Sequence, residues 1–370
     1  MWSTVWFSLI EDSYYSSEVR TILLVLFLGA YFLQIARLIL LRHRGEMRWL
    51  VIPAFFLMGL ISHLFLAALV KDSISALWIW QTGNGERLRW LNESVIVLCG
   101  FANIWGTWTA LKGPDLQTAE IPVPQWNNGE SIRITQISDL HVGPIIKRKY
   151  VQKVVDKINA LQADLVVITG DLGDGAVDDL LDDLEPLRNI SAPRGVYFVT
   201  GNHEYYWNAP AWIQTVKSLG IHVLENQGVS LSGLWLGGVP DISAHHFAGM
   251  AASDPKQAMV GSESGQFKVL LAHQPKSAIA AEAAGFDLTL SGHTHKGQFF
   301  PFNLLVGFFN PHVQGLEKRN NMWVYVNQGT GFWGPPLRLG VPSEITLLTL
   351  RGIKNTMDLS KGPEAVEQSC

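Results

Sequence analysis

The segment Ile132–His141 reads IRITQISDLH, a short run of β-forming residues that ends in an aspartate and a histidine. The same order, an apolar run followed at once by polar residues, returns four more times along the chain. The later runs are Leu165–Thr169, Val196–Thr200, Val269–Ala272 and Leu288–Leu290, and further strands are expected at 229–239, 323–326 and 345–350. Helical patterns over 149–161 and 211–219 separate some of these runs. Alternating strands and helices predict an α/β domain.

Polar side chains that can bind a metal ion follow five of the predicted strands. They are Asp139 and His141, Asp171, Asn202 and His203, His273, and His293 and His295. Open α/β sheets bind ligands at the carboxyl ends of their strands, and residues two apart in extended chain point the same way. Carboxylate, imidazole and amide donors suit Mn, Fe or Zn better than Ca. The chain has only two cysteines, Cys99 and Cys370, so a cysteine-based zinc site is excluded.

The ordered set of motifs resembles the calcineurin-like metallophosphoesterases. The motifs are Asp139-x-His141, Gly170-Asp171, Gly201-Asn202-His203-Glu204, His273 and Gly292-His293-Thr294-His295, and the resemblance covers 132–350. The closing segments 328–338 and 342–346 are similar, more narrowly, to a membrane-anchored bacterial branch of predicted phosphohydrolases. Lys296 departs from the family pattern, in which a small residue usually follows the final histidine. This departure bears on phosphate or substrate contacts and not on metal binding.

The resemblance implies a four-layer α/β-β/α sandwich with a binuclear site for two divalent ions, Mn, Fe or Zn. One ion would be bound by Asp139, His141, Asp171 and His295, and the other by Asp171, Asn202, His273 and His293, with Asp171 bridging. A hydroxide that bridges the two ions would attack phosphorus in line. His203 would contact the phosphate and protonate the leaving oxygen, a role that suits an imidazole titrating at about pH 7.

Three other groups of residues are candidates for a functional or structural role. The acidic run Asp174, Asp178, Asp179, Asp182 and Asp183 is expected to form the solvated face of a helix. His245 and His246 follow a Gly-rich turn and are candidates for substrate binding, with surface histidines as the alternative. Arg338 lies in a loop rich in Gly and Pro and is a candidate for a phosphate contact, because arginine can bind phosphate through two hydrogen bonds.

The first third of the chain contains three apolar stretches long enough to cross a bilayer, which requires about 20 helical residues. They are expected at 21–41, 49–70 and 90–111, so residues 1–111 are predicted to form a transmembrane anchor and not a buried bundle in a soluble protein. Residues 112–130 contain three prolines and predict a linker. The metallophosphoesterase domain is expected over 131–352 and a tail over 353–370.

Charge indicates which partners to expect and how the chain crosses the membrane. Residues 112–370 carry 20 Lys+Arg and 25 Asp+Glu, which argues against nucleic acid as a partner. The expected partners are the lipid bilayer, of a bacterial inner membrane, and a phosphorylated substrate that is lipid-linked or soluble. The positive-inside rule counts Lys and Arg near the span ends. Arg42, Arg44, Arg48 and Lys112 lie densely on the side of the catalytic domain and favour a cytoplasmic location for it.

Two functions of different kinds fit the sequence. The first is a membrane-anchored, metal-dependent hydrolase of a phosphoester or pyrophosphate bond. Within it, one alternative is an enzyme similar to the UDP-2,3-diacylglucosamine pyrophosphatases of lipid A biosynthesis. The second function is a membrane-anchored module that binds metal without catalysis. Because neither a metal ligand of the family pattern nor the acid His203 is missing, the sequence favours the enzyme.

Overall fold

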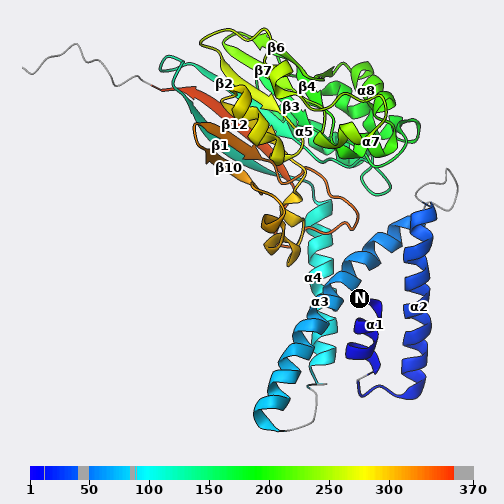
Figure 1. The fold of residues 1–370 in the computed structure, drawn as a ribbon. Helices are drawn as coiled ribbons and strands as arrows, with labels where there is room; N and C mark the ends of the chain where they lie inside the picture. Colours follow the sequence, from blue (N-terminus) through cyan, green and yellow to red (C-terminus); the bar gives the residue numbers. More distant parts are fainter. Residues whose placement is uncertain (12, 41–49, 84–87, 89, 354–370) are drawn as a thin grey trace, which may run out of the picture.

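The computed structural model describes residues 1–11, 13–40, 50–83, 88 and 90–353. Its N-terminal region is helical, and an α/β domain built on two sheets follows (Figure 1). The helices of the first region are α1 (Trp2–Val5), α2 (Ser17–Leu40), α3 (Val51–Thr82) and α4 (Leu91–Leu111). Residues 17–36 of α2, the whole of α3 and the whole of α4 are long and apolar enough to cross a membrane. Arg42, Arg44 and Arg48 lie outside the described residues.

Helix α3 continues to Thr82, well beyond the predicted end of the second apolar stretch at Val70. The charged residue Lys71 ends the apolar run in the sequence, yet its side chain is buried in the structure. Its ammonium group donates hydrogen bonds to the carbonyl oxygen of Ser8 at 2.6 Å and to the side-chain oxygen of Asn92 at 3.0 Å. The N-terminal segment and α4 therefore supply polar partners that allow the helix to continue past the charge.

The α/β domain contains two six-stranded sheets. The first has the order β1 (Asp115–Val123), β12 (Glu344–Gly352), β2 (Ser131–Ile137), β3 (Leu165–Thr169), β4 (Val196–Val199) and β5 (His222–Val223). The second has the order β10 (Gly315–Arg319), β11 (Met322–Val326), β9 (Leu288–Ser291), β8 (Phe267–Leu271), β7 (Leu234–Gly238) and β6 (Gln227–Leu231). Strands β2, β3 and β4 are parallel to one another, as are β7, β8, β9 and β11. Each parallel set therefore brings its carboxyl ends to one edge.

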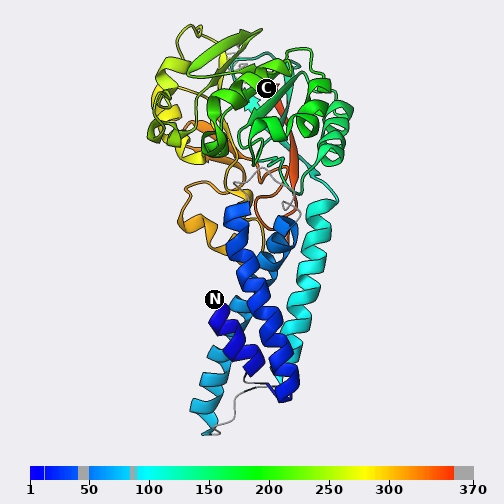
Figure 2. The ribbon, with the colours of Figure 1, turned by 90° about the vertical axis from the view of Figure 1, so that its right-hand side faces the viewer.

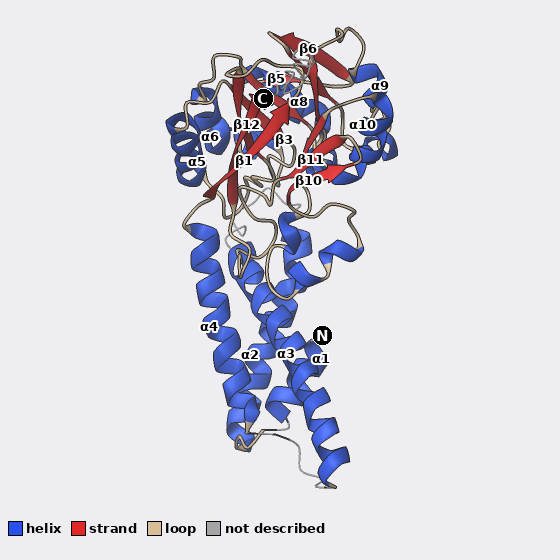
Figure 3. Cartoon of the chain, turned by 90° about the vertical axis from the view of Figure 1, so that its left-hand side faces the viewer, coloured by secondary structure: helices blue, strands red, loops and turns tan. Residues whose placement is uncertain are grey.

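Apolar side chains fill the space between the sheets and beneath the covering helices. Ile134 and Val167 of the first sheet share one core with Leu236, Val269 and Leu290 of the second. The outer layers are α5 (Arg148–Ala160), α6 (Leu181–Leu184) and α8 (Ala209–Ser218) on the first sheet, and α9 (Pro255–Ala258) and α10 (Ala278–Ala284) on the second (Figure 3). This arrangement confirms the expected four-layer α/β-β/α sandwich.

The predicted linker over 112–130 is wrong where β1 forms. Strand β1 pairs in parallel with β12 at the edge of the first sheet, with Asp115 opposite Glu344. Its pairing partner lies near the far end of the chain, so no local pattern reveals it. Much of the strand is solvent-exposed and it contains Pro122, which an edge strand tolerates because one side of its backbone needs no ladder hydrogen bond.

The α/β domain sits directly on the helical region, which runs beneath it as a bundle (Figure 2). Only three residues, 112–114, separate α4 from β1. The backbone N–H of Arg338 donates to the carbonyl oxygen of Gly106 in α4 at 2.9 Å. Nε2 of His63 in α3 lies 2.7 Å from the carbonyl oxygen of Phe300. Two helices are thus bonded to loops of the domain.

Candidate metal centre

The candidate site lies where five parallel strands of the two sheets end. Asp139 and His141 follow β2, Asp171 follows β3, Asn202 and His203 begin α7 (Asn202–Trp207) after β4, His273 follows β8, and His293 and His295 follow β9. The inward-facing edges of both sheets contribute to the site. Tertiary structure therefore brings together the polar residues that the sequence placed after separate strands.

The backbone is strained at several of these positions. The φ angle is 53° at Asp139, 51° at His141, 53° at Asp171, 70° at His293 and 46° at His295. Residues other than glycine rarely adopt positive φ, and each such conformation costs about 1–3 kcal/mol. Strain of this kind clusters at functional sites, where it aims side chains that an ordinary strand end would point elsewhere.

Asp139, His141 and His295 form the first group of converging donors. Nε2 of His295 lies 3.3 Å from Oδ1 of Asp139 and 3.0 Å from Nε2 of His141. Asp139 is fully buried, and its Oδ2 accepts a hydrogen bond of 2.9 Å from the backbone N–H of His293. The loop after β9 therefore fixes the carboxylate that follows β2.

Asp171, His273 and His293 form the second group. Nε2 of His273 lies 3.2 Å from Oδ2 of Asp171 and 3.1 Å from Nδ1 of His293. It also lies 3.1 Å from Oδ1 of Asn202. On the other side of its ring, His273 donates a 2.7 Å hydrogen bond from Nδ1 to the carbonyl oxygen of Thr169. This bond fixes the ring so that Nε2 faces the other donors.

The spacing of these donors fits divalent cations. Two ligands bound at roughly 2.1 Å, about a right angle apart, lie roughly 3 Å from one another. Nε2 of His141 lies 3.0 Å from Nε2 of His295, and Nε2 of His273 lies 3.1 Å from Nδ1 of His293. Asp171 stands between the groups, because its Oδ2 is 3.2 Å from Nε2 of His273 and 3.9 Å from Nε2 of His141. Nitrogen and oxygen donors of this kind suit Mn, Fe or Zn.

The electrostatics of the site keep its carboxylates charged. Burial alone would raise the pKa of Asp139 and Asp171, but the neighbouring histidines outweigh burial and hold both pKa values below the usual range. Burial likewise disfavours the charged form of His203, but Asp171 and Asp174 outweigh it and raise the pKa of His203 to about 9. The site thus concentrates negative charge that attracts cations.

Asp174 belongs to the site, so its assignment to a solvated helix face is wrong. Its Oδ1 accepts a hydrogen bond from Nδ1 of His203, and its Oδ2 lies 3.1 Å from Nδ1 of His141. The side chain is 19% exposed. Asp174 follows Asp171 by three residues, and this Asp-x-x-Asp spacing was the one local signal that could have separated it from the acidic run.

Glu204 is a second residue whose role sequence analysis missed. It is fully buried and accepts hydrogen bonds from the backbone N–H groups of Gly201 at 2.6 Å, Leu172 at 2.7 Å and Asp171 at 3.0 Å. Burial and the charge of Asp171 raise its pKa to about 8. Glu204 therefore ties the loop after β3 to the start of α7, which carry Asp171 and Asn202.

The prediction that Arg338 contacts phosphate is wrong, because its side chain is fully buried away from the cavity. The guanidinium donates to the carbonyl oxygens of Gln328 at 2.9 Å and Gly331 at 3.1 Å. Its Nη2 also lies 2.9 Å from Nδ1 of His295. Arg338 thus holds the loop 328–331 and the ring of His295 in place.

His245 and His246, the other residues suggested for substrate binding, are exposed in the short helical turn Ile242–His246. Nδ1 of His245 lies 2.6 Å from the carbonyl oxygen of Ile242. Neither residue lines the cavities that border the candidate site within the described part of the chain. Their role in substrate binding stays a prediction.

A cavity of about 260 Å³ opens over the two donor groups. Its lining residues are His141, Asp171, Asn202, His203, Tyr206, His293, His295 and Trp333. The rings of Tyr206 and Trp333 have centroids 5.2 and 5.9 Å from that of His203. The arrangement leaves room for a small anionic group beside the donors, under two aromatic side chains.

Comparisons with known proteins place these motifs among phosphoesterases. The sequence family described as Calcineurin-like phosphoesterase matches residues 132–297. An uncharacterized metallophosphoesterase of Campylobacter jejuni is 35% identical over 263 residues, which cover 70% of this chain and 70% of that protein. One of Helicobacter pylori is 36% identical over 247 residues, 66% of each chain. A Bos taurus protein named transmembrane protein with metallophosphoesterase domain is 37% identical over 269 residues, 67% of this chain and 60% of that protein.

Proposed function

Because this chain belongs to the calcineurin-like phosphoesterase family, we propose that it is a membrane-anchored, metal-dependent hydrolase of phosphoester or pyrophosphate bonds. The observation that carries the proposal is the position of Asp171 between two donor groups, with its Oδ2 3.2 Å from Nε2 of His273 and 3.9 Å from Nε2 of His141. A single structural metal ion needs only one such group. Two adjacent groups beneath a cavity, with a histidine beside them, provide what two-metal phosphoester hydrolysis requires.

The proposed ligands of the first ion are Asp139, His141, Asp171 and His295, and those of the second are Asp171, Asn202, His273 and His293. When bound, the two ions would stabilise the negative charge of the phosphate and activate water for attack on phosphorus. The buried carboxylates Asp139 and Asp171 stay ionised, which allows them to hold cations at neutral pH. The chemistry of the donors supports Mn, Fe or Zn equally.

His203 is proposed to supply the proton to the leaving oxygen. Asp174 accepts the hydrogen bond from its Nδ1, so Nε2 is the nitrogen available to the substrate. The backbone N–H of His203 donates to Oδ1 of Asp171 at 2.9 Å, which places the imidazole next to the donor groups. Nearby carboxylates favour the protonated ring, while bound cations would oppose that effect and bring its pKa closer to neutrality.

The helices α2, α3 and α4 are proposed to anchor the enzyme in a lipid bilayer, that of a bacterial inner membrane. None of the residues in the apolar segment of α2 is buried within the protein, and 11% of those in α4 are. Apolar faces of this extent need a cover that water does not provide. The sequence-based alternative, a pyrophosphatase similar to those that act on UDP-2,3-diacylglucosamine, remains a narrower prediction within the same chemistry.

Replacement of Asp171 tests the proposal. Asp171→Ala removes the carboxylate proposed to bridge the two ions, so the purified full-length protein should lose bound metal and its hydrolysis of nitrophenyl phosphate esters. Asp156→Ala on the exposed face of α5 is the matched control and should keep both. The measurements are metal content by mass spectrometry and the rate with added Mn²⁺. Unchanged metal content and rate in Asp171→Ala would exclude the two-metal site.

A further inference from the structure

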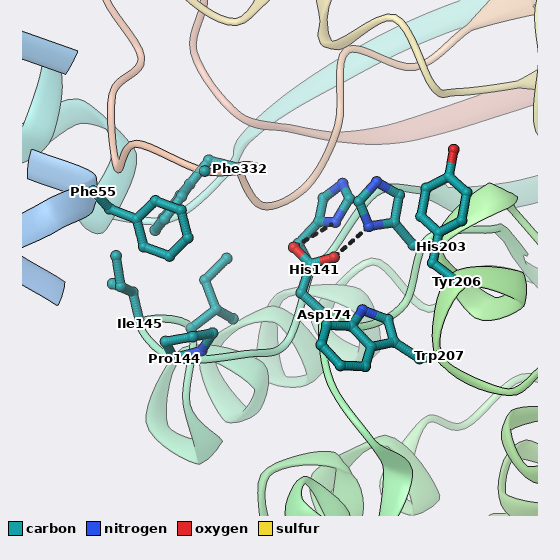
Figure 4. A pocket seen from close by; sticks show the side chains of 11 residues that line it. Phe55, His141, Pro144, Ile145, Asp174, His203, Tyr206, Trp207 and Phe332 are labelled. Atoms are coloured by element: carbon teal, nitrogen blue, oxygen red, sulfur yellow. Dashed lines mark hydrogen bonds and ion pairs between the residues drawn. The ribbon is translucent and has the colours of Figure 1, made fainter. Parts of the chain in front are cut away.

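A second cavity adjoins the candidate metal centre and extends toward the helical region (Figure 4). Its volume is about 260 Å³. His141, His203 and Tyr206 line both this cavity and the one over the donor groups, so the two spaces share a boundary. A ligand held at the metal centre could therefore continue into the second cavity.

The second cavity is polar at one end and apolar at the other. His141, Asp174 and His203 line the end next to the metal centre. The remaining lining includes Phe55, Pro144, Ile145, Ile146 and Phe332. Among the described residues, no charged side chain lines this part of the cavity. Figure 4 shows Phe55, Phe332 and Ile145 on the side away from His203 and Tyr206. The cavity therefore matches an amphiphilic molecule, because its polar end lies next to the candidate metal centre and its other end is apolar.

The apolar end is built partly by a helix proposed to cross the membrane. Phe55 belongs to α3, and the loop that carries Gly334 lies against the same helix. A Cβ atom at Gly334 would come within 2.9 Å of Cε of Met58, and one at Gly59 within 3.2 Å of Leu337. Because these contacts leave almost no gap, the cavity is bounded on this side by the first turns of α3.

An exposed apolar segment borders the same junction. Leu304, Phe308 and Phe309 are 64%, 82% and 72% exposed. The segment that contains them begins at Phe300, whose carbonyl oxygen lies 2.7 Å from Nε2 of His63 in α3. Large apolar side chains beside membrane helices are favoured where lipid covers them and disfavoured in water. We therefore expect the surface of the bilayer to reach the face of the α/β domain that meets the helical region.

We propose, resting on the function proposed above, that the substrate is a phosphorylated lipid. Its phosphate lies at the donor groups beside His203, and its apolar chain lies between Phe55, Ile145 and Phe332. A small soluble phosphate ester would use the metal end alone and would gain nothing from the apolar lining. A lipid fills both ends and reaches them from the membrane that α3 crosses.

Two series of phosphate esters with variable alkyl tails test the assignment. The full-length protein in detergent is assayed with Mn²⁺ on alkyl nitrophenyl phosphodiesters and on monoalkyl phosphates, with tails from about two to about ten carbons. In whichever series is hydrolysed, kcat/KM should rise by up to about fourfold for each methylene buried. A flat dependence on tail length would overturn the lipid assignment and leave the proposed function intact. If neither these esters nor nitrophenyl phosphate is hydrolysed, the proposed function itself fails.

A charged residue in the apolar end gives an independent test. Ile145→Glu places a carboxylate beside the proposed tail, and Ile279→Glu makes the same change at an exposed site on α10. The ratio of kcat/KM for a long-tailed ester to that for nitrophenyl phosphate should fall at least about tenfold in Ile145→Glu and stay unchanged in Ile279→Glu. Equal ratios in both variants, with matching thermal unfolding, would contradict the proposal.

Discussion

In the pair formed by Asp174 and His203, the two nitrogens of the imidazole have different roles. Nδ1 is hydrogen-bonded to the carboxylate, and Nε2 faces the donor groups. The carboxylate accepts the hydrogen bond from Nδ1, which orients the ring and stabilises its positive charge. Nε2 is then directed toward the donor groups and lies 3.9 Å from Oδ2 of Asp171. The pair is formed by residues that follow two different strands, so neither local sequence describes it.

His203→Ala should keep bound metal and lose activity by roughly 10²–10⁴-fold, the usual contribution of a general acid. The loss should be smaller for substrates with good leaving groups such as nitrophenol, because these depart without a proton. Asp174→Asn should lose about 10–100-fold, as expected for a residue that orients another. The measurements are metal content and kcat on esters of alcohols of graded acidity. Equal losses of His203→Ala on good and poor leaving groups would count against the acid role.

Arg338 has a side chain suited to bind phosphate, but it is buried and its hydrogen bonds are made within the protein. Its guanidinium satisfies backbone carbonyls of the loop 328–331 and contacts the ring of His295. Arg338→Ala would leave these buried acceptors without donors and should lower the free energy of unfolding by about 2–4 kcal/mol. We expect a lower Tm and a lower kcat with little change in KM. Arg351→Ala at the surface should have no such effect; a raised KM with normal Tm in Arg338→Ala would instead restore the phosphate contact.

At the scale of elements, only a short connection joins α4 to the first sheet. Helix α4 ends at Leu111 and β1 begins at Asp115, so the helix feeds the edge of the first sheet directly. Lys157 of α5 donates to the carbonyl oxygen of Pro114 in the short connection. The helical region is therefore joined to the α/β domain by a short, hydrogen-bonded connection and not by the long linker that 112–130 predicted.

Substitutions at two glycines of α4 distinguish an effect on the contact with the α/β domain from an effect on the stability of the helix itself. A Cβ atom at Gly106 would lie 2.6 Å from Cδ1 of Leu337, whereas one at Gly100 would meet nothing within 4 Å. Gly106→Val should therefore push the loop of Leu337 and Arg338 away and cost about 1–3 kcal/mol, while Gly100→Val should be tolerated. Thermal unfolding and hydrolysis rates of both variants check this. Similar Tm values in the two would show that the loop does not depend on this contact.

At the scale of the whole molecule, the order of the helices predicts on which side of the membrane the α/β domain lies. The C-terminal end of α2 and the N-terminal end of α3 lie at the same end of the bundle as the α/β domain (Figure 1). The segment between these helices contains Arg42, Arg44 and Arg48, and Lys112 follows α4. Lys and Arg accumulate in short cytoplasmic segments, so the catalytic domain is expected in the cytoplasm.

Reporters fused after Cys370, which lies outside the described residues, test this topology. A fluorescent protein that folds only in the cytoplasm should be bright, and alkaline phosphatase, which is active only outside, should be inactive. The converse result would place the active site outside. It would also require the lipid substrate to be drawn from the opposite leaflet, since the cavity and the domain share one end of the bundle.

The sequence by itself predicted an α/β domain with polar residues at its strand ends, and its resemblance to a known family implied the four-layer sandwich and the donors of the candidate site. Strands β2, β3 and β8 are short apolar runs followed at once by polar residues, and parallel strands of one sheet end at a common edge. Local alternation, together with a motif order that resembles a known family, was therefore sufficient to predict which donors would meet. Their roles as metal ligands and as acid remain proposals that the variants above test.

Tertiary structure alone decided the features that depend on contacts between distant segments. Strand β1 pairs with β12 from the other end of the chain, and Asp174 is drawn out of an acidic run by two histidines. Arg338 is buried, and Phe55 of α3 completes a cavity whose polar end belongs to the α/β domain. Local sequence records the propensity and polarity of a residue, whereas burial and partnership depend on which surfaces the whole chain brings together.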